Sequence, residues 1–255
     1  MIAKKEDEIQ NLRTAGKILS EVLQEVAQEA KAGVATAALD LLAEQLIRRA
    51  GAVPAFLNYK PAGAAYPYPA VLCVSINDEV VHGIPSEDDV LKEGDIVMLD
   101  LGLSYNGYFA DSARMVCVGP IDAKTERLFA AVREALSAGV AAARPGGRVG
   151  DIGAAIEAVA RKYGYAIAED LGGHALGKTP HEKPFIPNFG KPGTGEKILE
   201  GMVLAIEPIF IEGTSGAIVL DDDEWTYRTR DGSRSAEFEQ TILVTDGEPE
   251  ILTPF

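Results

Sequence analysis

The stretch VMLDLGLSYNGYFADSARMV, residues 97–116, predicts the central hairpin of the fold. Two runs rich in strand-forming residues flank Asn106-Gly107, a pair typical of two-residue hairpin turns. We therefore expect an antiparallel hairpin in which Asp100 and Asp111 lie almost opposite each other. Two close carboxylates in an apolar sheet repel unless one is protonated or a metal ion neutralises both. The alternative is that one caps a turn while the other faces solvent from an edge strand.

Length and composition limit the classes of protein to consider. A chain of 255 residues admits one large domain or two fused halves. The formal net charge of −15 argues against direct binding of nucleic acid, because phosphate binding requires a basic surface. Cys73 and Cys117 form no disulfide framework, so free thiols in a reducing, cytoplasmic setting are expected. The N-terminal residues do not resemble a signal peptide, and no run of about 18 apolar residues predicts a membrane span.

The arrangement of predicted elements occurs twice along the chain. Apolar residues at helical spacing predict helices over 5–31 and 37–49, the second capped by Thr36, and then over 125–144 and 149–163. Between the helix pairs we expect an extended segment over 52–59, a loop over 60–69 and a strand over 71–76. A shift of 113 positions superimposes Gly33 on Gly146, Glu44 on Glu157 and Gly51 on Gly164. This predicts two copies of one unit with a site between them, although two amphipathic helix pairs can also agree by chance.

The second half adds further residues that are costly to bury. His174 lies among glycines, His181 follows it, and Glu207 interrupts an apolar strand expected over 203–211. In the last strand, expected over 236–244, periodicity does not choose between Glu237 and Glu239, and we expect one of the two to face outward. A lone glutamate in a strand is often a salt-bridge partner. Several carboxylates with an imidazole instead suit Mn²⁺, Fe²⁺, Co²⁺ or Zn²⁺, and paired metals activate water in aminopeptidases.

Taken together, these residues resemble those of type I methionine aminopeptidases over nearly the whole chain. The resemblance implies the α+β pita-bread fold, with two pseudo-symmetric halves, antiparallel sheet inside and helices outside. It implies one catalytic domain over residues 1–255, with halves of roughly 5–118 and 121–252. It also implies two divalent ions (cobalt, manganese, iron or zinc) that Asp111 and Glu239 both bridge. The implied metal ligands are Asp100, Asp111, His174, Glu207 and Glu239.

The same resemblance implies the roles of the remaining site residues. His82 and His181 correspond to the two histidines that contact the substrate, and Glu207 would also transfer protons as a catalytic residue. The methionine pocket would be lined by Tyr59, Tyr68, Cys73 and Trp225. Four features depart from the family pattern: Ala175-Leu176, Pro180, Gln240 and the long 60–69 loop. Pro180 replaces a bulkier residue, which predicts a narrower preference for methionine over leucine.

The implied activity is removal of the N-terminal methionine from nascent or newly made polypeptides. The expected partner is a peptide N-terminus, with the ribosome as a further candidate, and the expected protein is a cytoplasmic monomer that binds neither nucleic acid nor membrane. Two other activities remain open on the same residues. One is an X-Pro aminopeptidase or dipeptidase of the same fold, whose members generally carry an extra N-terminal domain. The other is a non-catalytic binding protein that kept the fold.

Overall fold

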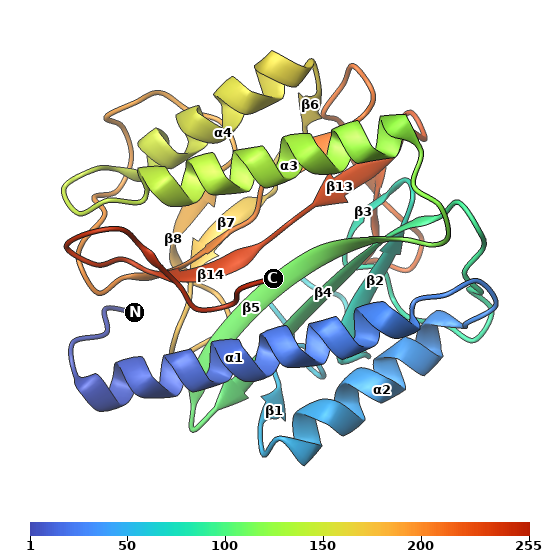
Figure 1. Ribbon diagram of the computed structural model, residues 1–255, viewed down its shortest axis with the longest axis horizontal. Helices are drawn as coiled ribbons and strands as arrows, with labels where there is room; N and C mark the ends of the chain where they lie inside the picture. The colour runs from blue at the N-terminus through green and yellow to red at the C-terminus, as the bar shows by residue number, and fades with distance from the viewer.

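Two helix pairs cover the outside of a core of antiparallel strands in the computed structural model, which describes all 255 residues. The first pair is α1 (Glu6–Glu29) and α2 (Thr36–Arg49), and the second is α3 (Ala123–Ala142) and α4 (Val149–Tyr163). Figure 1 shows the pairs on opposite sides, with strands of the two halves meeting between them. The predicted helices are thus confirmed to within two residues at each boundary.

The backbone conformations of equivalent glycines support the internal repeat. Gly33 and Gly146 adopt φ of +88° and +87°, and Gly51 and Gly164 adopt +74° and +75°. These left-handed conformations favour glycine and end or separate the helices of both pairs in the same way. The predicted cap of α2 is wrong, because Ala35 is the N-cap and Thr36 is already helical. The Thr36 hydroxyl instead donates to the Ser86 carbonyl (3.1 Å).

The first half is organised around one long hairpin. Strand β4 (Ile96–Tyr105) pairs with β5 (Tyr108–Cys117) on one edge and with β2 (Leu72–Ile76) and β1 (Val53–Pro54) on the other. The hairpin closes at Asn106-Gly107 as predicted, and both residues have positive φ. The expected extended segment over 52–59 is limited to the two residues of β1. One face of this sheet packs on α1, whose apolar stripe is buried.

The second half contains a five-stranded sheet in the order β15-β14-β9-β7-β8 and a smaller sheet, and a further small sheet joins two of its strands to β3 of the first half. Its strands are β7 (Gly172–Ala175), β8 (Glu182–Pro187), β9 (Val203–Ile206), β14 (Gln240–Leu243) and β15 (Glu250–Ile251). The smaller sheets have the orders β13-β10-β6 and β11-β12-β3. Their strands are β3 (Glu79–Val81), β6 (Ala166–Ile167), β10 (Ile209–Ile211), β11 (Ile218–Leu220), β12 (Tyr227–Thr229) and β13 (Ser235–Glu237).

The two predicted strands that contain Glu207 and Glu239 are each broken at that glutamate. The segment expected over 203–211 separates into β9 and β10 around Glu207-Pro208, and that over 236–244 separates into β13 and β14 around Phe238-Glu239. The breaks face each other, because β14 pairs with β9 while β13 pairs with β10. Pro208 cannot donate a hydrogen bond to a neighbouring strand, which favours the break there. The prediction of continuous strands is therefore wrong, and both glutamates lie at bends.

The halves join where β5 meets the second bend. The Glu239 N–H donates to the Ala113 carbonyl (2.9 Å), and the Ser112 hydroxyl donates to the Glu239 carbonyl (2.8 Å). The Thr241 hydroxyl donates to the Asp111 carbonyl (2.7 Å). Position 239 therefore bonds to the other half of the molecule instead of continuing its own sheet, which brings residues of both halves to one place.

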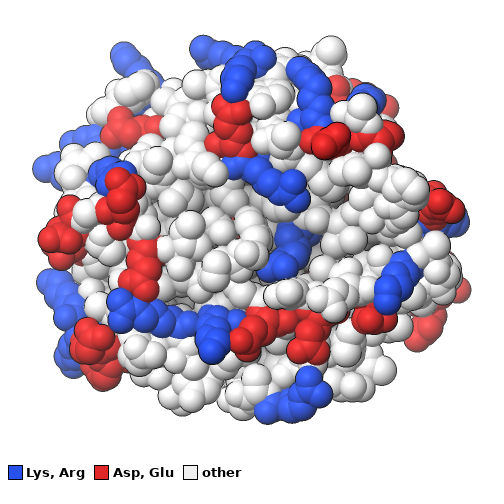
Figure 2. Space-filling model, in the orientation of Figure 1, with Lys and Arg blue, Asp and Glu red and all other residues white.

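The face of the molecule that carries the helices has charges of both signs. In Figure 2 acidic and basic side chains of both signs are scattered over the face that carries the helices. Mixed charge of this kind does not form the continuous basic footprint that nucleic-acid binding requires. None of the four helices combines the length and apolar character needed to cross a membrane.

Candidate active site

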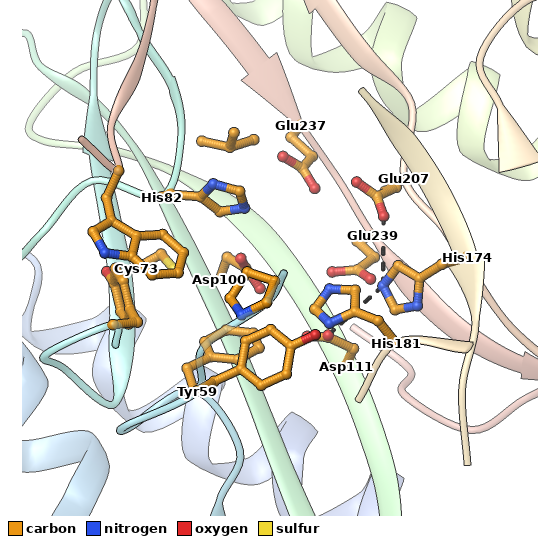
Figure 3. A pocket seen from close by; sticks show the side chains of 15 residues that line it. Tyr59, Cys73, His82, Asp100, Asp111, His174, His181, Glu207, Glu237 and Glu239 are labelled. Atoms are coloured by element: carbon orange, nitrogen blue, oxygen red, sulfur yellow. Dashed lines mark ion pairs between the residues drawn. The ribbon is translucent and has the colours of Figure 1, made fainter. Parts of the chain in front are cut away.

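A cavity of about 290 Å³ lies where the two halves meet. It contains every site residue selected from the sequence and joins a carboxylate-rich end to an aromatic end (Figure 3). No lysine or arginine lines it. The lining residues are Phe56, Tyr59, Pro61, Tyr68, Cys73, Val81, His82, Asp100, Asp111, His174, His181, Glu207, Trp225, Glu237 and Glu239.

The central hairpin supplies two of the carboxylates. Asp100 pairs with Ala113 and Asp111 pairs with Gly102, so the two aspartates are diagonal neighbours, close to the almost opposite placement that was predicted. Residues two apart on a strand share a face, and both side chains therefore point into the cavity. Their ligand oxygens form one compact group with Glu239, all within 4.8 Å of one another. The alternative of a turn cap and a solvent-facing edge residue is wrong.

His174 connects this group to the bend at Glu207. The His174 Nε2 atom lies 3.7 Å from Glu207 Oε1 and 3.9 Å from Asp111 Oδ2. Burial lowers the pKa of His174 to about 3, so the ring is neutral at ordinary pH. Its Nδ1 lies 3.0 Å from the Ala175 carbonyl, and donation there leaves the Nε2 lone pair facing the carboxylates. That is the tautomer a metal ligand requires.

Burial makes it unfavourable for these carboxylates to be ionised together without a counter-charge. Desolvation raises the pKa of Asp100 to about 7 and that of Glu207 to about 8. Desolvation and neighbouring carboxylates also raise the pKa values of Asp111 and Glu239 well above their usual range. Asp100 Oδ1 and Asp111 Oδ1 are buried without a hydrogen-bond partner. With no cationic side chain in the cavity, divalent metal ions are the fitting counter-charge for this donor set.

Glu237 is a lining residue that the sequence left undecided. The expectation that either Glu237 or Glu239 faces outward is wrong, because each is 3% exposed and both line the cavity. Glu237 Oε2 is buried without a partner, yet its carboxylate belongs to none of the compact ligand groups. In Figure 3 it lies between His82 and Glu207. The two-residue period of a strand could have predicted this, because it places Glu237 and Glu239 on the same face.

The aromatic end is built by edge-on ring contacts. The Trp225 ring lies 5.1 Å from Tyr68 and 6.0 Å from His82, both nearly perpendicular. The Tyr68 hydroxyl donates to the Gly83 carbonyl (2.9 Å), which satisfies its polar atom inside the wall. Cys73 is buried beside them. Three further lining residues were not expected from the sequence, because their apolar side chains are indistinguishable from ordinary core residues: Phe56, Pro61 and Val81.

The two further histidines face the cavity from opposite sides. His181 stacks on Tyr59 at 5.2 Å and lies 4.3 Å from the His174 ring. Its ring nitrogen also falls within 4.8 Å of ligand atoms of Asp111 and His174. His82 adopts φ of +61°, a left-handed conformation uncommon for a residue with a side chain. Burial lowers the pKa of His82 to about 4, so this ring is also neutral.

The four departures from the family pattern lie at different distances from the cavity. Pro61 of the 60–69 loop lines it, and the Tyr66 hydroxyl of that loop donates to the Asp223 carbonyl (2.5 Å). Pro180 is not a lining residue, which removes the basis for the predicted change in methionine preference. Gln240 faces away and donates to the Thr253 carbonyl (3.3 Å). Ala175-Leu176 is buried but also absent from the lining.

Fold and site together define a metallopeptidase. The profile of metallopeptidase family M24 matches residues 10–246, and the chain belongs to this family. Among its relatives, the methionine aminopeptidase of Aquifex aeolicus (strain VF5) is 45% identical over 249 residues, covering 96% of each chain. The crystal structure of methionine aminopeptidase from Rickettsia prowazekii superposes with a TM-score of 0.94 at 39% identity, covering all of both chains.

A more distant structure shows how far the fold extends. Prolidase from Pyrococcus furiosus has a TM-score of 0.77 and 24% identity, and the present chain spans 66% of it. Likeness at this identity concerns the fold alone. The predicted α+β pita-bread fold is confirmed by both structures.

Proposed function

We infer that the protein is a methionyl aminopeptidase, a metalloexopeptidase that removes the N-terminal methionine from polypeptides. The observation that carries this conclusion is one cavity joining a carboxylate–histidine cluster to an aromatic slot. A hydrolytic centre needs the first, and recognition of a long apolar side chain needs the second. Similarity to methionine aminopeptidases over nearly the whole chain supports the same activity.

This carboxylate–histidine cluster would bind two divalent ions. The compact group of His174, Glu207 and Glu239 overlaps at Glu239 with the group of Asp100, Asp111 and Glu239. This overlap supports Glu239 as a bridging ligand, and the approach of Asp111 to His174 supports Asp111 as the second bridge. The donor set suits cobalt, manganese, iron or zinc. When bound, such ions lower the pKa of a water molecule and polarise the scissile carbonyl.

The chain's own residues would bind the peptide and move the protons. Glu207 takes a proton from the attacking water and passes it to the leaving amine, a role open to a carboxylate that lies within reach of the reacting groups. His181 donates a hydrogen bond to the carbonyl oxygen as negative charge develops there. His82 contacts the peptide near the scissile nitrogen. Both histidines line the cavity, which supports these assignments.

The aromatic end would hold the methionine side chain. Trp225, Tyr68 and Cys73 are buried there, and Tyr59 lines the same cavity beside His181. A thioether against aromatic ring edges gains about 0.3–1.5 kcal/mol per contact, which favours methionine over an aliphatic side chain of similar length.

The physiological substrate would be the N-terminus of a nascent or newly made polypeptide. We propose that the enzyme acts as a cytoplasmic monomer, with the ribosome as a candidate partner that supplies nascent chains.

Metal content and peptide turnover separate this function from its two rivals. The protein, purified without chelator, should contain close to two divalent ions per chain and hydrolyse Met-Ala-Ser. An X-Pro peptidase would instead cleave X-Pro peptides and leave Met-Ala-Ser intact. A non-catalytic relative would cleave neither, with or without added Mn²⁺ or Co²⁺. Either of these last two results would overturn the proposal.

A further inference from the structure

The tryptophan of the aromatic slot is not held by any hydrogen bond of its own side chain. Trp225 is buried, and its indole nitrogen has no partner. The position of the ring therefore depends on ring contacts and on the backbone that carries it. Two ring contacts come from the lining residues Tyr68 and His82, and the third comes from Tyr66, 6.4 Å away and nearly perpendicular. Tyr66 does not line the cavity, so it supports the indole from outside the slot.

The backbone at Trp225 is shaped by one aspartate. The N–H groups of Trp225 (2.9 Å) and Thr226 (2.8 Å) both donate to Asp223 Oδ1. The Thr226 hydroxyl donates to Asp223 Oδ2 (2.5 Å). Glu224, inside this turn, adopts φ of +61°, which is uncommon for a residue with a side chain. A turn of this kind relies on the side chain that accepts from its backbone, so the place of Asp223 determines the direction of Trp225.

Tyr66 binds that same aspartate from the opposite half of the molecule. Its hydroxyl donates to the Asp223 carbonyl (2.5 Å), across 157 residues of sequence. This is the only hydrogen bond between the 60–69 loop and the 221–226 turn. Ala64 and Tyr66 also pack against the buried aromatic cluster. The loop therefore contacts the turn through one side chain, which supplies both a ring contact and a hydrogen bond.

The base of the loop is formed by the two tyrosines of the slot. The Tyr68 N–H donates to the Tyr59 carbonyl (2.9 Å), and the Asn58 N–H donates to the Tyr68 carbonyl (2.9 Å). The loop is thus closed between Tyr59 and Tyr68 and attached to the Trp225 turn near its second end. It links three of the four residues proposed to hold the methionine side chain.

We propose that Tyr66 is a specificity-determining residue that acts by positioning Trp225. Through its ring and its hydroxyl it holds the indole wall at a fixed distance from Tyr59 and Tyr68, which sets the width of the slot. Tyr66 does not reach the cavity, so it acts through Trp225 and not on the substrate. The proposal rests on the proposed function, in which this slot binds the methionine side chain. A slot held narrow fits an unbranched side chain better than a branched one of similar volume.

Two variants loosen the wall from its two sides. Tyr66→Phe removes only the hydroxyl, and Asp223→Ala removes the acceptor that shapes the turn. Each should lower the ratio of kcat/KM for Met-Ala-Ser over Leu-Ala-Ser about threefold, a smaller effect than loss of the Trp225 ring. The loss should come mainly from a higher KM for the methionine peptide, because the slot binds a side chain that takes no part in bond cleavage. Metal content should not change. Since both variants displace one ring, their effects should not be additive.

Fluorescence reports on the slot without relying on activity. The chain has a single tryptophan, so selectively excited emission comes from Trp225 alone. In Tyr66→Phe and Asp223→Ala this emission should shift to longer wavelength and be quenched more strongly by acrylamide, because a loosened wall admits solvent to the indole. Saturation with a methionine peptide should protect the wild-type enzyme from quenching more than either variant.

Matched controls separate this role from a general loss of stability. Tyr163→Phe also removes a hydroxyl that donates a hydrogen bond, to Glu134 (2.9 Å), but on the outer helices far from the slot. Asp222→Ala removes the exposed carboxylate next to Asp223. Both controls should match the wild type in emission, quenching and peptide preference.

The outcomes decide whether the inference stands. If Asp223→Ala does not fold, Tyr66→Phe alone decides. Wild-type quenching in Tyr66→Phe would overturn the positioning role, and stronger quenching with an unchanged methionine preference would overturn the role in specificity. A Trp225→Phe enzyme with full methionine preference would instead refute the proposed slot itself, whatever the quenching of Tyr66→Phe.

Discussion

The two ends of the cavity are held together in opposite ways. At the aromatic end Phe56, Tyr68, Cys73 and Trp225 form a buried apolar cluster, and the Tyr68 hydroxyl has backbone partners. This end is stable as packed. The carboxylate end, in contrast, gathers groups from both halves whose charges repel and whose oxygens lack partners. The difference indicates that the aromatic end is preformed, whereas the carboxylate end depends on bound cations.

The sharpest test of the carboxylate end is Glu207→Gln. The amide cannot take up a proton, so kcat should fall by about 100- to 10,000-fold, the range typical of a positioned proton-transfer group. Turnover of Met-Ala-Ser measures the loss. The exposed Glu200→Gln variant is the control and should behave as wild type. Near wild-type turnover of Glu207→Gln would mean that Glu207 is neither base nor essential ligand.

A matched pair of glutamates tests which carboxylates hold metal. Glu239→Gln should weaken metal binding by at least about 100-fold, since loss of a shared ligand should exceed the 10- to 100-fold effect of an outer partner. Glu237→Gln should change it less than about tenfold, because Glu237 belongs to none of the compact ligand groups. Titration calorimetry with Mn²⁺ measures both. Equal losses in the two variants would make Glu237 a ligand as well.

The dependence of stability on pH follows from the raised pKa values. In the folded, metal-free protein the pKa of Asp100 is about 7 and that of Glu207 about 8, against 3.8 and 4.5 when unfolded. The folded state therefore binds more protons, and stability is lost as pH rises through 7 to 8. Burial lowers the pKa of both His174 and His82 below the unfolded value of 6.5, so these groups change stability only at lower pH.

Between pH 6.5 and 8 the metal-free protein should lose on the order of 2 kcal/mol of unfolding free energy. Added Mn²⁺ or Co²⁺ should restore it by mass action, with a larger rise in Tm at pH 8 than at pH 6 because protons compete for the ligands. Chemical denaturation and thermal scans of chelated and metal-loaded samples provide the measurement. A Tm that does not respond to metal at either pH would contradict the dependence of the carboxylate end on cations.

At the aromatic end a single ring should matter less. Trp225→Phe removes part of the slot wall without losing a hydrogen bond, because the indole nitrogen has no partner. Preference for Met-Ala-Ser over Leu-Ala-Ser, compared as kcat/KM, should fall roughly tenfold, or about 1.4 kcal/mol. Metal affinity should not change. If metal affinity fell and the preference stayed, the two ends would not be separate in function.

Pro180→Phe should have the smallest effect. Because Pro180 does not line the cavity, the ratio of kcat/KM for methionine and leucine peptides should change less than twofold. The same two peptides measure it. A clear gain in methionine preference would show that the turn bearing Pro180 closes over the slot when substrate binds.

The two ends of the cavity also differ in how many of their site residues could be predicted from the sequence. Asp100, Asp111 and Glu207 are carboxylates in apolar surroundings, so the cost of burying them was enough to select them as site residues. Tyr59, Tyr68, Cys73 and Trp225 came only from resemblance, because aromatic residues are ordinary in cores.

The bend at Glu207 had a local signal in Pro208, but the bend at Glu239 could not be predicted from local pattern. The Glu239 bend exists because the Glu239 N–H bonds to Ala113, far away in sequence, and such tertiary pairing overrides the alternation of a single strand. The diagonal placement of Asp100 and Asp111 likewise depends on the register of the hairpin.

The proposed chemistry depends above all on one cluster, drawn from both halves, that holds two metal ions. Anomalous diffraction from crystals loaded with Co²⁺ or Mn²⁺ can locate such ions. We expect two peaks inside the cavity, both bordered by Asp111 and Glu239, one also by Asp100 and the other by His174 and Glu207. A single peak without a second ion at saturating metal, or peaks only outside the cavity, would show that the cluster is not a dinuclear centre.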